Sequence, residues 1–307
     1  MERVSRRGWL AGAAAGSLAG VAALPLAGLT AAGAAMAAPA AGKKARLRTA
    51  ICAYSFRTEL GSKKMSYNDL VDLAVDLDVD GLDLTVYWFP STSDDFLIPL
   101  RNYAFANGVE IPSISVRTNC CQPTAELRAK ETQTIKDWVD VAVKLGAGHI
   151  RVFGGTVPKT STEDTAAGWV VEVLKDAGAY AAKRGVVLGL ENHGGITERA
   201  DRIIDILKRV DLPSVRVNLD MGNFHKDAYK QLEQIAPYAA NVQVKVDLRD
   251  ETGKEVPADW ERIIRMLKAS GYRGYLSLEY EAKAPAPVEV PRLTRQLNAV
   301  VKKVSAA

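Results

Sequence analysis

Residues 170–193 read VVEVLKDAGAYAAKRGVVLGLENH and contain one complete step from a helix to a strand. The first half has an apolar face at helical spacing, made by Val170, Val173, Leu174 and Ala177. Gly185 ends this pattern, and the apolar run 186–190 that follows is typical of a buried strand. The stretch therefore predicts a helix that packs on a sheet and leads directly into the next strand.

The same alternation recurs along the chain. Short β-rich runs begin near Arg48, Asp80, Glu110, His149, Val186, Val215, Val242 and Tyr275. Amphipathic segments lie between them, including one that Ser66 can cap and one that Gly146 can end. Eight such units match an α/β fold with one (β/α)8 TIM barrel, predicted over residues 41–307. A doubly wound open sheet is the alternative, but residues 54–57 do not form the Gly-rich phosphate loop that it needs.

The N-terminal segment has the composition of an export signal. Residues 8–42 carry no charged side chain and follow directly on Arg6 and Arg7. They consist mostly of Ala and Gly, which enter lipid less readily than Leu, Ile, Val or Phe. Small residues stand at positions 35 and 37, on either side of Met36. We therefore predict a twin-arginine signal peptide over residues 1–40, read by the Tat export machinery, and a periplasmic or extracellular location. An uncleaved signal would anchor the protein to the membrane.

The composition excludes disordered, collagen-like and coiled-coil proteins, and the net charge does not indicate a nucleic-acid-binding protein. Apolar residues make up 48% of the chain and charged residues 25%, which is ordinary for a globular protein. The formal net charge of +4 gives no argument for nucleic acid as a partner. The cysteines are sparse and odd in number, so no disulfide framework is predicted; they are Cys52, Cys120 and Cys121.

Three expected strands end in an acid, at Glu191, Asp220 and Glu279. In this kind of barrel the carboxyl ends of the strands meet at the face where active sites lie. Buried carboxylates are costly unless they are paired or bind a cation. Carboxylate and amide oxygens suit a hard divalent metal such as Mn²⁺ or Mg²⁺. The alternative is that each acid caps a helix or pairs with a nearby Lys or Arg.

Three motifs at these strand ends resemble the sugar phosphate isomerase/epimerase family, the xylose isomerase-like TIM-barrel group that also includes endonuclease IV-type enzymes. They read GLENHGG at 189–195, NLDMGN at 218–223 and GYLSLEYE at 274–281. The resemblance extends over roughly residues 46–300 and implies a xylose isomerase-like barrel.

The resemblance also implies a metal site. Its ligands would be Glu191, Asp220, Gln243 and Glu279. Gln243 stands where the family usually has a histidine. An amide oxygen favours Mn²⁺ or Mg²⁺ over Co²⁺ or Zn²⁺, and the same change is compatible with a degraded or absent metal site.

The implied chemistry is proton transfer next to a carbonyl group through a metal-stabilised enediolate, with Glu191 and Glu279 as the catalytic acid and base. Further side chains are candidates for binding the substrate: His193, Lys245, Asn223, Arg117, Arg151 and Trp88. For Lys245 the alternative is a solvated surface lysine. Either arginine could instead neutralise the acids, and Trp88 could belong to the core.

We therefore expect a metal-dependent sugar isomerase or epimerase that acts on a small carbohydrate. Elimination from a keto-glycoside at the same site is one alternative, and a barrel that binds carbohydrate without turnover is another. A DNA repair endonuclease is disfavoured, because it needs several more histidine ligands than the three histidines of this chain provide. A homo-oligomer is left open, since helix faces of such barrels often pair.

Overall fold

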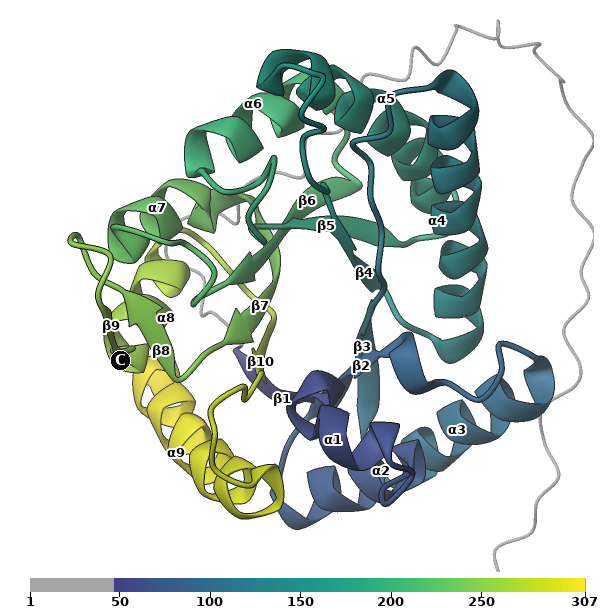
Figure 1. The fold of residues 1–307 in the computed structure, drawn as a ribbon. Helices are drawn as coiled ribbons and strands as arrows, with labels where there is room; N and C mark the ends of the chain where they lie inside the picture. The colour runs from purple at the N-terminus through teal and green to yellow at the C-terminus, as the bar shows by residue number, and fades with distance from the viewer. Residues whose placement is uncertain (1–46, 307) are drawn as a thin grey trace, which may run out of the picture. The chain divides into compact units, whose positions relative to one another are not determined.

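The computed structural model describes residues 47–306, and the predicted signal peptide lies outside them. Within this range eight parallel strands form a closed barrel in the order β1-β10-β7-β6-β5-β4-β3-β2, which confirms the predicted fold (Figure 1). The barrel strands are β1 (Arg48–Cys52), β2 (Gly81–Thr85), β3 (Glu110–Ser115), β4 (His149–Phe153), β5 (Val187–Glu191), β6 (Val215–Asp220), β7 (Ala239–Val244) and β10 (Tyr275–Leu278).

Helices surround the ring of strands (Figure 1). They are α1 (Arg57–Gly61), α2 (Tyr67–Asp76), α3 (Asp94–Ala106), α4 (Ala125–Leu145), α5 (Glu163–Ala182), α6 (Ala200–Val210), α7 (Ala228–Ile235), α8 (Trp260–Ala269) and α9 (Ala286–Ala306). Single 3₁₀ turns form η1 (Ala53–Phe56), η2 (Val86–Trp88) and η3 (Ala236–Tyr238). A small antiparallel hairpin, β8 (Asp247–Arg249) with β9 (Glu255–Pro257), follows β7.

Local sequence signals place several helix ends as predicted. Ser66 caps α2 through a reciprocal capping box with Asp69. Gly146 ends α4 in the left-handed region, at φ 77°. The predicted strand starts are confirmed to within a few residues, with β7 furthest off because it begins at Ala239 rather than near Val242. The early part of β7 contains the polar Asn241, which is buried and hydrogen-bonded to polar groups inside the barrel.

Polar and charged side chains are buried inside the barrel, in the middle of the strands as well as at their carboxyl ends. They include Asp83, Ser115, Arg151, Glu191, Asn218, Asp220, Asn241, Gln243 and Glu279. Apolar residues fill the layer between strands and helices instead, as in α5, whose buried residues include Val170, Leu174 and Ala177. Within residues 47–306, no helix combines the length and apolar character that a membrane crossing needs.

Candidate active site

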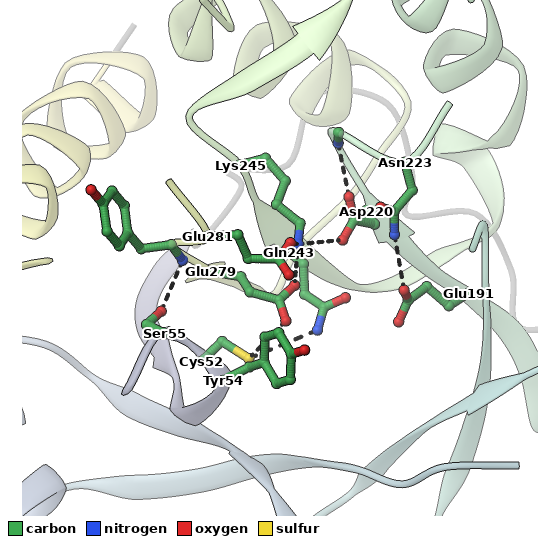
Figure 2. Close-up of polar contacts among 12 residues, drawn as sticks. Cys52, Tyr54, Ser55, Glu191, Asp220, Asn223, Gln243, Lys245, Glu279 and Glu281 are labelled. Carbon is green, nitrogen blue, oxygen red and sulfur yellow. Dashed lines mark hydrogen bonds and ion pairs between the residues drawn. The ribbon is translucent and has the colours of Figure 1, made fainter. Parts of the chain in front are cut away.

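Glu191 ends β5, and positive and polar groups surround its buried carboxylate. The Arg151 Nε atom lies 3.1 Å from Oε2, and both side chains are only 3% exposed. The Asn223 side chain donates to Oε1 at 3.0 Å (Figure 2). The His193 Nδ1 atom lies 2.6 Å from the same oxygen. Arg151 was predicted either to bind the substrate or to neutralise the acids, and its ion pair favours neutralisation of Glu191.

The Lys245 ammonium lies among three carboxylates (Figure 2). Its Nζ atom is 2.9 Å from Oε2 of Glu279 and 3.3 Å from Oδ2 of Asp220. It also donates a hydrogen bond to Glu281. Lys245 and Glu279 are buried, whereas the Glu281 side chain is 42% exposed. Lys245 is therefore a buried part of the site and not a solvated surface lysine.

Asp220 ends β6 and is fully buried. Its Oδ1 atom accepts a hydrogen bond from the Gly222 backbone at 2.8 Å. The Oδ2 atom faces the Lys245 ammonium but has no hydrogen-bond partner. Among the described residues of the cluster, it is the one buried carboxylate oxygen whose only partner is the ion pair with this ammonium.

The Gln243 side chain is engaged below the carboxylates. Gln243 pairs with Asp220 in the sheet register. However, its amide oxygen accepts a hydrogen bond from Asn218 at 2.7 Å, and its amide nitrogen faces the Cys52 sulfur at 3.8 Å. Both ends of the amide thus have partners inside the barrel.

A chain of buried amides continues from Gln243 across the barrel. Asn218 is also 3.4 Å from Glu191, and Asn241 donates to both Asn218 and Asp83 at 2.9 Å. Burial raises the pKa of Asp83 to about 6, and the hydrogen bond from Asn241 opposes the shift. This network fixes the orientation of the amides beneath the carboxylates.

The pKa values of Asp220 and Glu279, the two buried acids beside Lys245, are shifted in opposite directions. Burial, together with Glu191 and Glu279, raises the pKa of Asp220 well above its usual value, although Lys245 opposes this. Burial also acts to raise the pKa of Glu279, but Lys245 and Arg151 outweigh it and lower that pKa. Glu279 is therefore ionised at neutral pH and has the protonation state of a base.

An aromatic wall stands next to these charges. The Tyr54 ring lies 6.3 Å from that of Tyr87 and 5.9 Å from that of Trp88. The Tyr87 hydroxyl accepts a hydrogen bond from Arg151 at 3.2 Å, and the exposed Arg117 guanidinium lies 4.5 Å from the Tyr87 ring. The structure thus gathers the predicted Trp88, Arg117 and Arg151 around one tyrosine.

A cleft of about 520 Å³ opens onto the cluster. Asn223, Lys245, Glu279 and Glu281 border it, and Glu255 of the β8–β9 hairpin also contributes to its lining. Its volume falls within the range of small-molecule sites, roughly 300–1,000 Å³. The cleft therefore gives a small polar ligand access to the Lys245 ammonium.

Several residues of this site were not among the sequence candidates, and Glu281, Asn218 and Tyr87 are three of them. Glu281 follows Glu279 by two positions and Asn218 precedes Asp220 by two, so strand alternation could have indicated both. Tyr87 lies in the turn η2, where no periodic pattern predicts the direction of a side chain. His193 and Asn223, which were predicted, both reach Glu191.

These residues do not fit a divalent metal in the expected ligand set. The unpartnered oxygen of Asp220 would suit one, but the amide oxygen of Gln243 is bonded to Asn218 and an ammonium already lies beside Asp220 and Glu279. Among residues 47–306, no group of three or more His, Cys, Asp or Glu side chains is arranged to hold a metal ion. Glu191, Asp220, Gln243 and Glu279 as ligands therefore stay a prediction from the resemblance.

The closed parallel barrel defines a (β/α)8 protein, and its candidate site residues lie at the carboxyl ends of the strands, where active sites of such barrels are found. The sequence profile of the xylose isomerase-like TIM barrel family matches residues 71–302. The chain therefore belongs to that family. None of the curated proteins compared with it matches.

Solved structures show the same fold at low sequence identity. A xylose isomerase-like TIM barrel protein from Mycobacterium smegmatis, in complex with magnesium, is 20% identical, with a TM-score of 0.66 over 84% of this chain and 97% of that one. D-psicose 3-epimerase from Clostridium cellulolyticum H10, with D-tagatose, is 18% identical, with a TM-score of 0.64 over 84% and 96%. The probable 3-DHS dehydratase AsbF from Bacillus anthracis is 16% identical, with a TM-score of 0.63 over 83% and 98%.

Proposed function

We propose that this protein is a sugar isomerase or epimerase that moves a proton at the carbon next to a carbonyl group. The observation that carries the proposal is the pair of buried carboxylates, Glu191 and Glu279, each held against a cation at the carboxyl end of a barrel strand. The epimerases among its structural neighbours support a sugar substrate.

Glu279 would remove the proton from this carbon, because the Lys245 ammonium keeps the Glu279 carboxylate ionised. Removal of that proton places negative charge on the carbonyl oxygen, which fixed positive groups stabilise. Arg151 supplies one such group beside Glu191, and Lys245 supplies another beside Glu279. Glu191 would begin the turnover protonated and would give its own proton to the opposite face of the carbon, while the proton taken up by Glu279 passes to solvent. His193 and Asn223 hold the Glu191 carboxyl group in place.

The substrate would be a free monosaccharide. The aromatic wall of Tyr54, Tyr87 and Trp88 offers an apolar surface to the face of a sugar ring. We also propose that the protein acts in the periplasm or outside the cell after export by the Tat machinery, on the composition of residues 1–40. Sugar phosphates are mostly intracellular, so such a location favours an unphosphorylated sugar.

A divalent metal is the competing source of positive charge. The magnesium complex of the Mycobacterium smegmatis barrel supports a metal. The engaged Gln243 amide oxygen and the ammonium beside Glu279 argue against one in this chain. Elimination is the competing reaction, supported by the dehydratase among the structural neighbours, since it begins with removal of the same proton. A binding barrel without turnover is the third alternative.

The test is an incubation of purified protein with D-psicose, D-fructose and D-tagatose, followed by product analysis by NMR. We expect an epimer or isomer of at least one sugar, greatly reduced formation by Glu191→Gln and Glu279→Gln, and full activity in the control Glu251→Gln, whose residue is exposed. An unsaturated product would support elimination instead. Binding of these sugars without any product would contradict the proposal and support a binding barrel.

A further inference from the structure

We infer that the Lys245 ammonium is the built-in cation of this site and takes the place of a divalent metal among the carboxylates of Asp220, Glu279 and Glu281. Nζ lies 2.9 Å from Glu279 and 3.3 Å from Asp220, and it donates a hydrogen bond to Glu281. Carboxylates that converge on one point need a cation there, and the lysine provides it.

The fold holds the lysine in this position. Gly222 leaves room for its stem, because a Cβ atom at residue 222 would lie 2.8 Å from Cγ of Lys245 and 3.0 Å from its Cβ. The Trp260 indole donates a hydrogen bond to the Lys245 backbone carbonyl at 2.8 Å. Lys245 is only 8% exposed. The ammonium is therefore packed in place rather than reaching in from the surface.

The remaining expected ligands are also engaged. Arg151 neutralises Glu191, and the Gln243 oxygen accepts its hydrogen bond from Asn218. A divalent ion beside Asp220 and Glu279 would have to lie next to the ammonium, and like charges this close repel strongly. Binding such an ion therefore requires that Lys245 be displaced or removed.

Lys245 has two roles in this inference, and each can be tested separately. The first role, exclusion of a metal ion, depends only on the geometry of the cluster. That its ammonium stabilises charge on a substrate oxygen rests on the proposed function, and the position of Lys245 on the cleft wall gives it access to that oxygen. Metal binding is therefore the primary readout, because it does not need turnover.

The experiment compares Mn²⁺ binding to chelator-treated wild type, Lys245→Met, Lys245→Arg and the control Lys302→Met by isothermal titration and by electron paramagnetic resonance. Lys302 is a surface lysine whose side chain is 75% exposed. We expect Lys245→Met to bind about one equivalent of Mn²⁺ at least about tenfold more tightly than wild type. Without the ammonium, the buried carboxylates of Asp220 and Glu279 are uncompensated, and a bound cation stabilises them. Lys245→Arg keeps the positive charge and, like Lys302→Met, should match wild type.

Tight stoichiometric binding of Mn²⁺ by wild type would overturn the inference, as would a folded Lys245→Met with no gain in affinity. If Lys245→Met does not fold, wild type and Lys245→Arg still decide, since both must lack tight binding. A failure of the proposed function would appear separately, as absence of turnover in wild type whatever the metal result.

Discussion

The Nζ atom of Lys245 lies 2.9 Å from Oε2 of Glu279, and both side chains are almost completely buried. The two residues directly follow neighbouring strands, since β7 pairs with β10 in the barrel. Lysine and glutamate are rarely this buried unless they are paired. The pair couples the charge state of the expected base to a cation that the chain itself supplies.

Replacement of Glu279 by Gln should lower turnover by a factor of about 10²–10⁴, the usual contribution of a general base. The amide has nearly the same volume as the carboxyl group, so the fold should persist. Steady-state kinetics and circular dichroism check both expectations. A Glu279→Gln protein with wild-type turnover would show that another group removes the proton.

Substitution of Gln243 by His alone should leave Co²⁺ binding unchanged, because the Lys245 ammonium remains among the carboxylates. The double variant Gln243→His with Lys245→Met should bind Co²⁺ more tightly than Lys245→Met, since imidazole is a good ligand for this metal. Visible absorption during a Co²⁺ titration measures both. Stoichiometric Co²⁺ binding by the single variant would mean that Lys245 does not block the site.

Gly189 gives space to the His149 ring inside the barrel. A Cβ atom at residue 189 would lie 2.1 Å from Nε2 of His149 and 3.0 Å from Cβ of Asn218. Gly189→Ala should therefore lower the free energy of unfolding by about 1–3 kcal/mol, as overpacking does. Gly148→Ala is the matched control, because a Cβ there has no neighbour within 4 Å and the change should stay within about 0.5 kcal/mol. Urea unfolding compares them, and equal effects would argue against the close fit.

His149 should make the protein less stable in mild acid. Burial, with a contribution from Arg151, lowers its pKa from 6.5 to about 3 in the folded state. The unfolded chain therefore takes up the proton first, so stability is full above the unfolded pKa and is lost as the pH falls from about 6.5 toward 3. Between pH 7 and pH 5 this amounts to about 2 kcal/mol.

The matching measurement is urea unfolding of wild type and His149→Gln at these two pH values. The variant lacks the titrating ring, so its stability should fall less on acidification than that of wild type. An identical fall in both proteins would show that His149 is not the group responsible.

The sequence predicted the barrel well because its determinants are local. Apolar periodicity, Ser66 at a helix start and Gly146 at a helix end mark their elements without knowledge of distant contacts. The acids Glu191, Asp220 and Glu279 were identifiable because strand ends in such a barrel converge on one face. The barrel and these acids therefore follow from the order of elements and from strand alternation alone.

The partners of those acids could not be predicted in the same way. Whether Lys245 points to solvent or into the cluster depends on the space above Gly222, which belongs to a different strand end. The Gln243 amide turns toward Asn218 because buried amides across β6 and β7 form one network. The directions of these side chains depend on tertiary packing. Carboxylates whose sequence motif suggests a metal site can therefore surround a lysine ammonium instead.

The most direct measurement is solvent deuterium exchange by chelator-treated protein with the ketose that it converts, followed by mass spectrometry and NMR. We predict that deuterium enters at the carbon next to the carbonyl group without added metal, and that Glu279→Gln loses this exchange. Exchange that appears only after addition of Mn²⁺ or Mg²⁺ would contradict the role given to Lys245. No exchange with any sugar under either condition would contradict the proposed proton transfer itself.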